Sequence, residues 1–462
     1  MSEILIKNGN IVTSNNVYKS DILIKDSKIE LIDINIKTNS PNVKIIDAQS
    51  MYVLPGAIDP HVHMELPTPA GNSSDDFRTG SIAALAGGTT SIIDFVTPSK
   101  GQSFIEALNL RKKEAEKSLI DYGFHMSPTW WGKNSANEMK KCVIEEGITS
   151  FKTYLAYKKV VGISDEILIN VMKTAKDLNA LVTLHCENGD IVDFLKNKFI
   201  SEGKTQTKYH VLSRPPEVES EAVNRATTFA KLVGCPIYIV HVSTKQSIDI
   251  IKKAQESGQK VYAETCPHYL LLDKNIFNKN DFSQTAPYVL SPALRTKEHR
   301  NKLWNALSNN IINTVASDHC PFNVIGQKDV GINDFTKIPN GAGGVEHRLS
   351  LLYTYGVSAN LITINQFVDL IATNPAKIFG LSHRKGKIAK GMDADIVIWN
   401  PDKEEIISAK THKQNCDSNI FENYKVKGMP EIVIANGKIA LENDTVNVND
   451  LKGNYLFRKV QK

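Results

Sequence analysis

Residues 54–63 read LPGAIDPHVH, an apolar run that ends in two histidines separated by one valine. A short apolar run of this kind is typical of a buried strand in a parallel sheet. Side chains alternate between the two faces of a strand, so His61 and His63 should point to the same side. The middle of the chain repeats the pattern of this stretch, so the stretch indicates the fold of the whole middle region.

Seven later segments also combine apolar or β-branched residues with polar residues at their ends. They are TTSIIDFVTP (89–98), DYGFHMSPTW (121–130), SFKTYLAY (150–157), ALVTLHCEN (180–188), CPIYIVHVS (235–243), KVYAETCPHYL (260–270) and NTVASDHCPF (313–322). Helical patterns fall between them, for example over residues 103–118 and 163–180. Eight such β/α units predict an α/β fold, a (β/α)₈ TIM-like barrel over residues 53–384. A doubly wound open sheet is the alternative, but no Gly-rich dinucleotide fingerprint follows the early strands.

Both ends of the chain have a different residue pattern, with short strand candidates separated by turn residues. The candidates are ILIKNGNIVT (4–13), SDILIKDSKIELID (20–33), KGKIAKGMDADIVIWN (385–400) and EIVIANGKIA (431–440). Neither end is long enough to form a core alone. We therefore predict one small β-sandwich domain built from residues 1–52 plus 385–445. Residues 446–462 are expected to form a C-terminal tail, either an arm or a frayed end.

Composition narrows the class of protein. The 462 residues are 41% hydrophobic and 23% charged, with a net charge of +5, which is ordinary for a globular protein. No basic stripe suggests nucleic-acid binding, and no run approaches the roughly eighteen apolar residues of a membrane span. The N-terminus lacks a signal-peptide pattern, and six scattered cysteines favour free thiols in a reducing compartment. We expect a soluble, cytoplasmic protein.

The polar residues at the predicted strand ends suggest chemistry. In a (β/α)₈ barrel the carboxyl ends of all strands converge on one rim. A single histidine there is more often structural, and a single aspartate can cap the next helix. Joint placement of six candidate ligands on five strands instead predicts a metal centre. The six are His61, His63, Lys152, His185, His241 and Asp318.

Lys152 needs its own explanation. An ammonium beside divalent cations is repelled, and four imidazoles with one carboxylate are too few ligands for two bridged metals. A neutral lysine amine can add carbon dioxide, which gives a carbamate with one oxygen for each metal. An ordinary salt bridge or an extended surface lysine is the alternative, and the residues alone leave both open.

The motifs HVH, FKTYLAY, HCEN, VHVS and SDHCPF resemble, in this order, the signature of the two-metal members of the amidohydrolase superfamily. The fuller likeness is to the dihydropyrimidinase/hydantoinase family and runs over nearly the whole chain. It includes MELPTPAGNSSDDF (64–77), LSPALR (290–295), IPNGAGGVEHR (338–348) and NYKVKGMPEIVIANGK (423–438).

The resemblance implies a role for each matching residue. The four histidines would ligate two divalent metals, expected to be zinc, carboxylated Lys152 would bridge them, and Asp318 would complete the first site. Tyr157 would stabilise the oxyanion, although alone it would pass as a packing residue at the rim. Backbone groups of Ser291 and Asn340 would hold the substrate, although beside prolines both would pass as turn residues.

The resemblance also implies a reaction. A hydroxide between the metals would attack a ring carbonyl carbon, and Asp318 would carry the proton to the leaving ring nitrogen. Ring opening of 5,6-dihydrouracil or a 5-substituted hydantoin would give an N-carbamoyl amino acid. The partner is thus a small cyclic diamide, and the family commonly forms homotetramers.

Three rival functions remain. Allantoinases and dihydroorotases share the metal ligands, but dihydroorotases typically place an arginine just after HxH, where this chain has Met64 and Glu65. The collapsin response mediators are structural relatives that have lost ligands, whereas this chain keeps six.

Some residues leave substrate preference open. Many hydantoinases carry GVEDR where this chain has His347 in GVEHR, and Tyr154 and Val161 lie in the loop expected to face the substrate's side chain. His268 and His319 are candidates either for orienting ligands or for purely structural roles.

Overall fold

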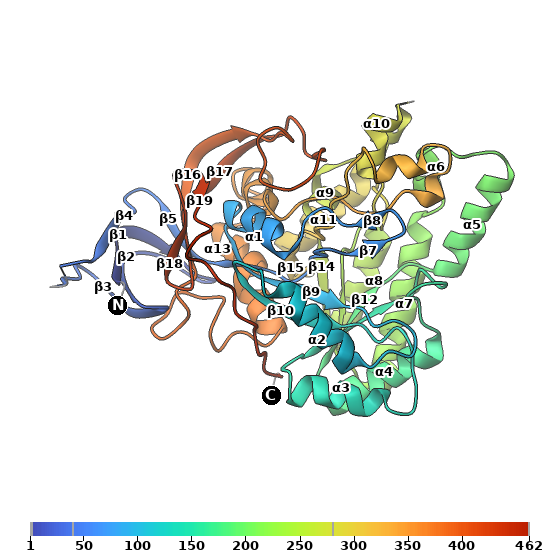
Figure 1. The fold of residues 1–462 in the computed structure, drawn as a ribbon, viewed down its shortest axis with the longest axis horizontal. Helices are drawn as coiled ribbons and strands as arrows, with labels where there is room; N and C mark the ends of the chain where they lie inside the picture. Colours follow the sequence, from blue (N-terminus) through green and yellow to red (C-terminus); the bar gives the residue numbers. More distant parts are fainter. Residues whose placement is uncertain (1–2, 39–40, 280, 461–462) are drawn as a thin grey trace.

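The computed structural model describes residues 3–38, 41–279 and 281–460, and it contains a parallel barrel and a separate mixed sheet (Figure 1). Each barrel strand pairs in parallel with its neighbours. The barrel strands are β6 (Ala57–Asp59), β9 (Thr89–Val96), β10 (Asp121–Met126), β11 (Ser150–Tyr154), β12 (Leu181–His185), β13 (Ile237–Ile239), β14 (Val261–Thr265) and β15 (Thr314–Val315). All eight lie inside the predicted segments, so the predicted barrel is confirmed.

The first and last strands meet just beyond their carboxyl ends. A parallel bridge joins Val62 to His319. The buried guanidinium of Arg348 braces this seam, because it donates to the carbonyls of Ile58 (3.1 Å) and Val315 (2.8 Å). The GVEHR segment therefore contributes a brace between β6 and β15.

Helices surround the barrel, and their ends follow from local sequence. The predicted helix over residues 103–118 is α2 (Phe104–Ala115), and Ser103 caps it by accepting from the backbone amide of Glu106. The one predicted over 163–180 is α4 (Asp165–Asp177), which Ser164 caps in the same way. The other longer helices are α1 (Phe77–Ala86), α3 (Ser135–Ile144), α5 (Gly189–Ser201), α7 (Pro216–Val233), α8 (Lys245–Glu256) and α11 (Lys297–Ser308). Of the helices in the described ranges, none combines the length and apolar character needed to cross a membrane.

Shorter elements form the rim and the junctions. The short α-helices are α6 (Lys208–Leu212), α9 (Pro267–Leu271), α10 (Phe282–Thr285), α12 (Arg348–Leu352), α13 (Ile364–Val368) and α14 (Asn374–Ile378). Other turns are η1 (Lys274–Asn278), η2 (Ala286–Tyr288), η3 (Lys328–Gly331), η4 (Phe335–Lys337), η5 (Tyr353–Val357) and η6 (Asp369–Thr373), and β7 (Pro67–Thr68) pairs with β8 (Gly71–Asn72).

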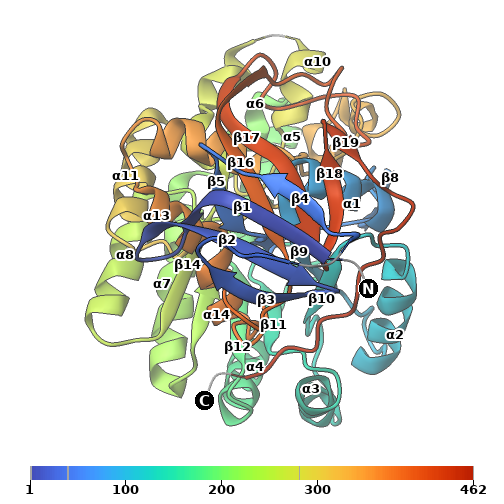
Figure 2. The ribbon, with the colours of Figure 1, turned by 90° about the vertical axis from the view of Figure 1, so that its left-hand side faces the viewer.

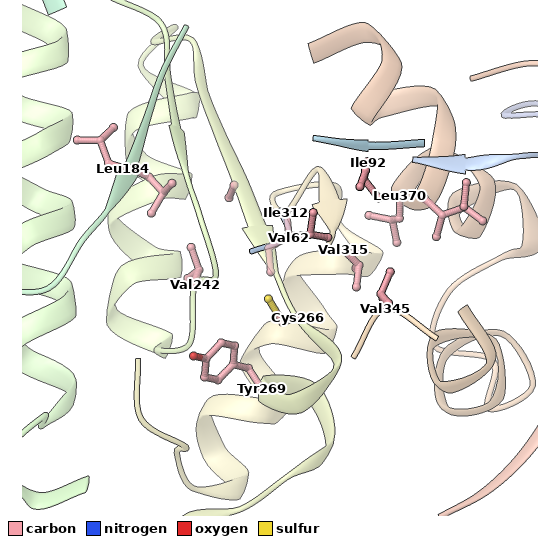
Figure 3. Packing of buried hydrophobic residues seen from close by; sticks show 14 of the residues in the cluster. Val62, Ile92, Leu184, Val242, Cys266, Tyr269, Ile312, Val315, Val345 and Leu370 are labelled. Atoms are coloured by element: carbon pink, nitrogen blue, oxygen red, sulfur yellow. The ribbon is translucent and has the colours of Figure 1, made fainter. Parts of the chain in front are cut away.

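The main hydrophobic core lies between the barrel strands and the helices around them. Figure 3 shows part of it, with Ile92 and Leu184 from barrel strands and Leu370 from η6. Burial of such side chains, at about 25 cal/mol per Å² of apolar area, is what holds the strand ends at fixed positions.

The two ends of the chain share one nine-stranded sheet beside the barrel (Figure 2). Its strands are β1 (Glu3–Val12), β2 (Val17–Lys25), β3 (Lys28–Asp33), β4 (Lys44–Asp47), β5 (Tyr52–Pro55), β16 (Ile396–Ile406), β17 (Lys425–Ala435), β18 (Lys438–Glu442) and β19 (Thr445–Val446). N-terminal β5 pairs with C-terminal β16, which confirms a β unit built from both termini. A second core of isoleucines, valine, alanines and methionine fills it.

The change from one sheet to the other occurs at Gly56. All of β5 pairs with the small sheet and β6 with the barrel, so the predicted boundary at residues 52/53 falls inside β5. A Cβ on Gly56 would lie 2.3 Å from Thr90 Oγ1, so only glycine fits this crossing. Lys385 ties the two units together, because its ammonium contacts Asp121 of β10 (2.7 Å) and Asp395 beside β16. The division into domains itself stays a prediction.

The predicted C-terminal tail packs as an arm against its own barrel. The amide of Leu456 donates to Tyr122 O (2.7 Å), and the amide of Arg458 donates to Gly147 O (3.1 Å). The buried Arg458 guanidinium also donates to Ser150 Oγ (2.9 Å). The described part of the tail therefore does not fray. It crosses the amino ends of β10 and β11, opposite the strand ends that carry the predicted ligands.

Candidate metal centre

Every predicted ligand lies in or just after a barrel strand. His61 and His63 follow β6, and Lys152 lies within β11. The others are His185, the last residue of β12, His241, two residues after β13, and Asp318, three residues after β15. The barrel thereby brings side chains from five strands to its carboxyl rim.

His61, His63 and Asp318 form one group. Asp318 Oδ1 lies 3.2 Å from His61 Nε2 and 3.4 Å from His63 Nε2. One possible ligand atom from each residue falls within 4.8 Å of the others, a spacing that suits a shared cation. The two imidazole rings, 5.2 Å apart, both pack on Phe95.

His185 and His241 form a second group beside the first. His185 Nδ1 lies 2.9 Å from His241 Nε2, so one nitrogen of each ring is aimed at the other. The His241 ring is 5.4 Å from that of His61, which joins the two groups. All four predicted histidine ligands therefore lie in one cluster.

Lys152 is buried beside this cluster. Its ammonium lies 5.0 Å from the centre of the Phe95 ring, the ring on which both His61 and His63 pack. Burial lowers the pKa of Lys152 to about 8, even though the carboxylates of Glu264 and Asp318 favour its charged form. A lysine with this pKa is neutral in about one molecule in ten at pH 7.

The protonation states suit metal ligation. Burial lowers the pKa of His61 and of His241 far below the usual value for imidazole, and it also lowers the pKa of His185. Although burial opposes it, the facing imidazoles hold the pKa of Asp318 well below its usual range. Neutral imidazoles and an ionised carboxylate are the forms that bind divalent cations.

Two buried glutamates that the sequence prediction missed orient the histidines. Glu264 Oε1 lies 2.7 Å from His61 Nδ1, and Glu187 Oε2 lies 2.9 Å from His185 Nε2. Each carboxylate thus holds the ring nitrogen opposite the one that faces the cluster. Arg214 donates to Glu187 (2.6 Å) from a fully buried position. The available signal was a glutamate inside an apolar strand (Glu264) and one two residues after a ligand (Glu187).

Tyr157, Ser291 and Asn340 come together at the same rim. The Tyr157 ring lies 5.2 Å from that of His185. Burial raises the pKa of Tyr157, while hydrogen bonds with Ser291 and Asn340 act to lower it. Asn340 Nδ2 donates to Ser291 Oγ (3.0 Å). The three predicted substrate residues therefore form one group next to the second histidine pair.

Backbone conformation at the site is strained. Tyr157, His241, Asp318 and Glu65 all have a positive φ, of 56°, 38°, 50° and 48°. Residues other than glycine rarely adopt this region, at a cost of roughly 1–3 kcal/mol each. The amides of Val160, Val161 and Gly162 all donate to Tyr157 O, which holds the tyrosine in place.

The neighbouring candidates differ in role. His319 Nε2 lies 3.0 Å from Asp75, and its Nδ1 accepts from the amide of Gly344, so it supports the rim next to Asp318. His268 is buried with its Nε2 unpaired among the described residues. Cys186 and Cys320 are buried free thiols whose pKa is raised by burial, which suits packing.

The Glu65 side chain forms an ion pair with a nearby lysine. It pairs with Lys117 (2.8 Å), which also contacts Asp76 (3.0 Å). Nearby Arg111 is bound to Asp94 (2.7 Å) and to the carbonyl of Met64. Neither side chain just after HxH is therefore placed as a receptor for a substrate carboxylate.

Known proteins resemble this chain over almost its full length. Residues 52–440 match the amidohydrolase family. The chain is 46% identical to a D-hydantoinase of Geobacillus stearothermophilus (95% of this chain, 92% of the relative) and 39% identical to a dihydropyrimidinase of Rattus norvegicus (99% and 89%). It is also similar to the crystal structure of dihydropyrimidinase from Brevibacillus agri, with a TM-score of 0.96, 42% identity and 99% of each chain covered.

Proposed function

The chain belongs to the hydantoinase and dihydropyrimidinase family of amidohydrolases, and from this membership we propose how its site opens a cyclic amide ring. The substrates are 5,6-dihydrouracil and 5-substituted hydantoins, and the products are N-carbamoyl amino acids. The observation that carries the proposal is the cluster of four histidines, Lys152 and Asp318 directly beside Tyr157, in which all but the half-buried His63 and Asp318 are buried.

The donor set fits two divalent cations. His61, His63 and Asp318 present atoms to one position, and His185 and His241 place one ring nitrogen each 2.9 Å apart beside them, so that both nitrogens could turn to a second cation. We propose that these residues, with Lys152, hold the metals, and that the metals are zinc. When bound, two such cations polarise a carbonyl and make water acidic at neutral pH.

We propose that Lys152 is carboxylated. Its neutral amine attacks carbon dioxide, a C–N bond forms as one C=O π bond breaks, and the amine loses a proton to water, which leaves a carbamate whose single negative charge is shared by two oxygens. The lowered pKa of Lys152 supports this step because it supplies neutral amine near pH 7. The carbamate adds the bridging anion that four imidazoles and Asp318 do not provide.

The remaining steps are carried by the side chains at the rim. Asp318 is ionised, so it would accept a proton from the attacking water and return it to the ring nitrogen as the C–N bond breaks. Tyr157, whose phenol stays protonated, would donate its hydroxyl to the carbonyl oxygen as that oxygen becomes an oxyanion. Backbone groups of Ser291 and Asn340 would pair with the diamide edge of the ring.

Discrimination among rings would follow from charge. Dihydroorotate adds a carboxylate, which needs a cationic partner when it leaves water. Met64 and Glu65 stand where dihydroorotases place an arginine, Lys117 binds Glu65, and Arg111 is engaged by Asp94. Dihydrouracil and small hydantoins need no such partner.

The test is a substrate panel on metal-loaded protein: kcat/KM for dihydrouracil, hydantoin, 5-phenylhydantoin, allantoin and dihydroorotate under one set of conditions. We expect the dihydropyrimidine and the hydantoins to be best, and dihydroorotate to show little or no turnover. Asp318→Asn is the control, because any turnover that it retains belongs to a contaminant. Highest activity on allantoin or dihydroorotate would refute the substrate assignment.

We also propose a homotetramer in the cytoplasm. Large apolar side chains stand exposed on neighbouring segments. Phe194 of α5 (66% exposed) and Leu212 of α6 (51%) lie on two helices that contact each other, and Ile332 (56%) lies in the turn that precedes η4, which also contacts α6. Such a patch suits a subunit interface. Light scattering during size-exclusion chromatography measures the mass of the assembly, and a monomeric mass would contradict the homotetramer.

The cytoplasmic location is supported by the six free cysteines, which suit a reducing compartment.

A further inference from the structure

Lys328, in the loop between Asp318 and Asn340, is almost fully buried with its amino group inside the protein. It opens η3, and its ammonium donates to three backbone carbonyls: Val289 O (3.0 Å), Pro339 O (3.1 Å) and Gly341 O (2.9 Å). An ammonium has three N–H donors, so this set uses all of them. In the chain as described, it has no carboxylate within 4.0 Å, so its partners are carbonyls alone.

The three carbonyls belong to the two segments that carry Ser291 and Asn340. Pro339 and Gly341 flank Asn340 on both sides, and Val289 lies two residues before Ser291. The amide of Gly341 also donates to Val289 O (3.1 Å), so the two segments run directly against each other. Lys328 therefore joins them at their point of contact.

The other carbonyls next to Ser291 are tied as well. His210 Nε2 lies 2.8 Å from Leu290 O, and the hydroxyl of Tyr269 donates to Pro292 O (2.6 Å). By contrast, over the described ranges no hydrogen bond reaches the backbone amide or carbonyl of Ser291 or of Asn340. Backbone groups are nearly always paired, so two half-buried residues with unpaired backbone groups between tied neighbours are suited to bind a ligand.

The second segment has little freedom to adjust. Gly341 has φ +146°, and a Cβ there would lie 2.4 Å from Cys320 O, so the segment is pressed against the strand end that carries Asp318. The amide of Cys320 donates to Ala342 O (2.9 Å). The position of Asn340 is thus set by Lys328 on one side and by the Asp318 segment on the other.

We propose that Lys328 is a positioning residue for substrate: it holds the backbone of Ser291 and Asn340 at the spacing that accepts the amide edge of the ring. This rests on the proposed function, because it concerns the residues assigned there to the substrate. Side-chain substitutions at Ser291 or Asn340 leave their backbone groups in place. Lys328 contacts the segments of both residues, so its substitution can displace both backbones at once.

The test uses Lys328→Met, which keeps an unbranched side chain one atom shorter than lysine and removes all donors, and Lys328→Gln, which has the same reach as methionine and keeps a two-donor amide. Lys337→Met is the matched control, because Lys337 lies in the same loop with its side chain 68% exposed. The measurements are KM and kcat for dihydrouracil, the inhibition constant of uracil, metals per chain and the melting temperature. Uracil presents the same imide edge and is not hydrolysed.

We expect KM and the uracil inhibition constant to rise about tenfold or more in Lys328→Met and by less in Lys328→Gln, with kcat and metal content much less affected. Lys337→Met should behave as wild type. If Lys328→Met does not fold, Lys328→Gln decides: wild-type KM and uracil inhibition in the folded variant would overturn the proposal. A wild-type protein that neither opens dihydrouracil nor binds uracil would instead refute the proposed function.

Discussion

Replacing Tyr157 with phenylalanine removes one hydroxyl and little else. The ring keeps its place 5.2 Å from His185, and the backbone is held by three amides that donate to the Tyr157 carbonyl. What is lost is the donor beside Ser291 and Asn340. If that hydroxyl binds the carbonyl oxygen as its charge develops, the loss falls on the transition state and not on the bound substrate.

The expected size follows from that role. Loss of one oxyanion donor costs about 10²–10³ in kcat, or about 2.7–4 kcal/mol, while KM changes far less. Because burial raises the phenol pKa above its usual 10.0, wild-type enzyme should keep this contribution at pH 9. The assay is kcat and KM on dihydrouracil at saturating metal, with metals per chain checked for each variant.

Tyr154→Phe is the matched control. The two tyrosine rings lie 6.5 Å apart, and both face His185, so the variants alter the same wall of the site. We expect Tyr154→Phe to retain most of kcat. An unchanged kcat with a raised KM in Tyr157→Phe would refute the oxyanion role and leave Tyr157 as a binding residue.

Three further outcomes are expected. Lys152→Ala should abolish turnover and lower metals per chain, and short carboxylic acids should partly restore both; near wild-type turnover would exclude a bridging carbamate. Glu264→Gln replaces the carboxyl group 2.7 Å from His61 Nδ1 with an amide, so metal affinity measured by chelator competition should fall about 10–100-fold, and an unchanged affinity would show that the glutamate does not support the ligand. Burial lowers the folded-state pKa of His61, His185 and His241 below 6.5, so protons bind the unfolded chain first, and the metal-free protein should melt at lower temperature as pH falls below about 6.5. A melting temperature that does not fall between pH 7.5 and 5.5 would contradict this.

Local pattern was enough to predict the barrel and the candidate ligands. A period of two placed His61 and His63 on one face, and the strand pattern placed His185 and Asp318 at one rim. Their proximity, such as 3.2 Å between His61 Nε2 and Asp318 Oδ1, follows from the closure of the barrel. The confirmed fold thus required only short strand and helix patterns and their eightfold repetition along the chain.

Features that depend on contacts between residues far apart in the sequence could not be predicted from local patterns. Glu264 meets His61 across 203 residues of sequence, and nothing local distinguishes it from a structural glutamate. Glu65 follows directly after HxH in the sequence, but its partner Lys117 is 52 residues away. The C-terminal arm is held by contacts with the barrel, where Arg458 donates to carbonyl and hydroxyl oxygens. Such contacts leave no periodic pattern of apolar residues in the sequence of the arm.

Elemental analysis of fully metal-loaded protein shows whether this rim holds two divalent cations. We expect about two metals per chain, bound by His61, His63, His185, His241, Lys152 and Asp318. His185→Ala together with His241→Ala should lower that number towards one. A wild-type stoichiometry that saturates at one, or at none, would contradict the account.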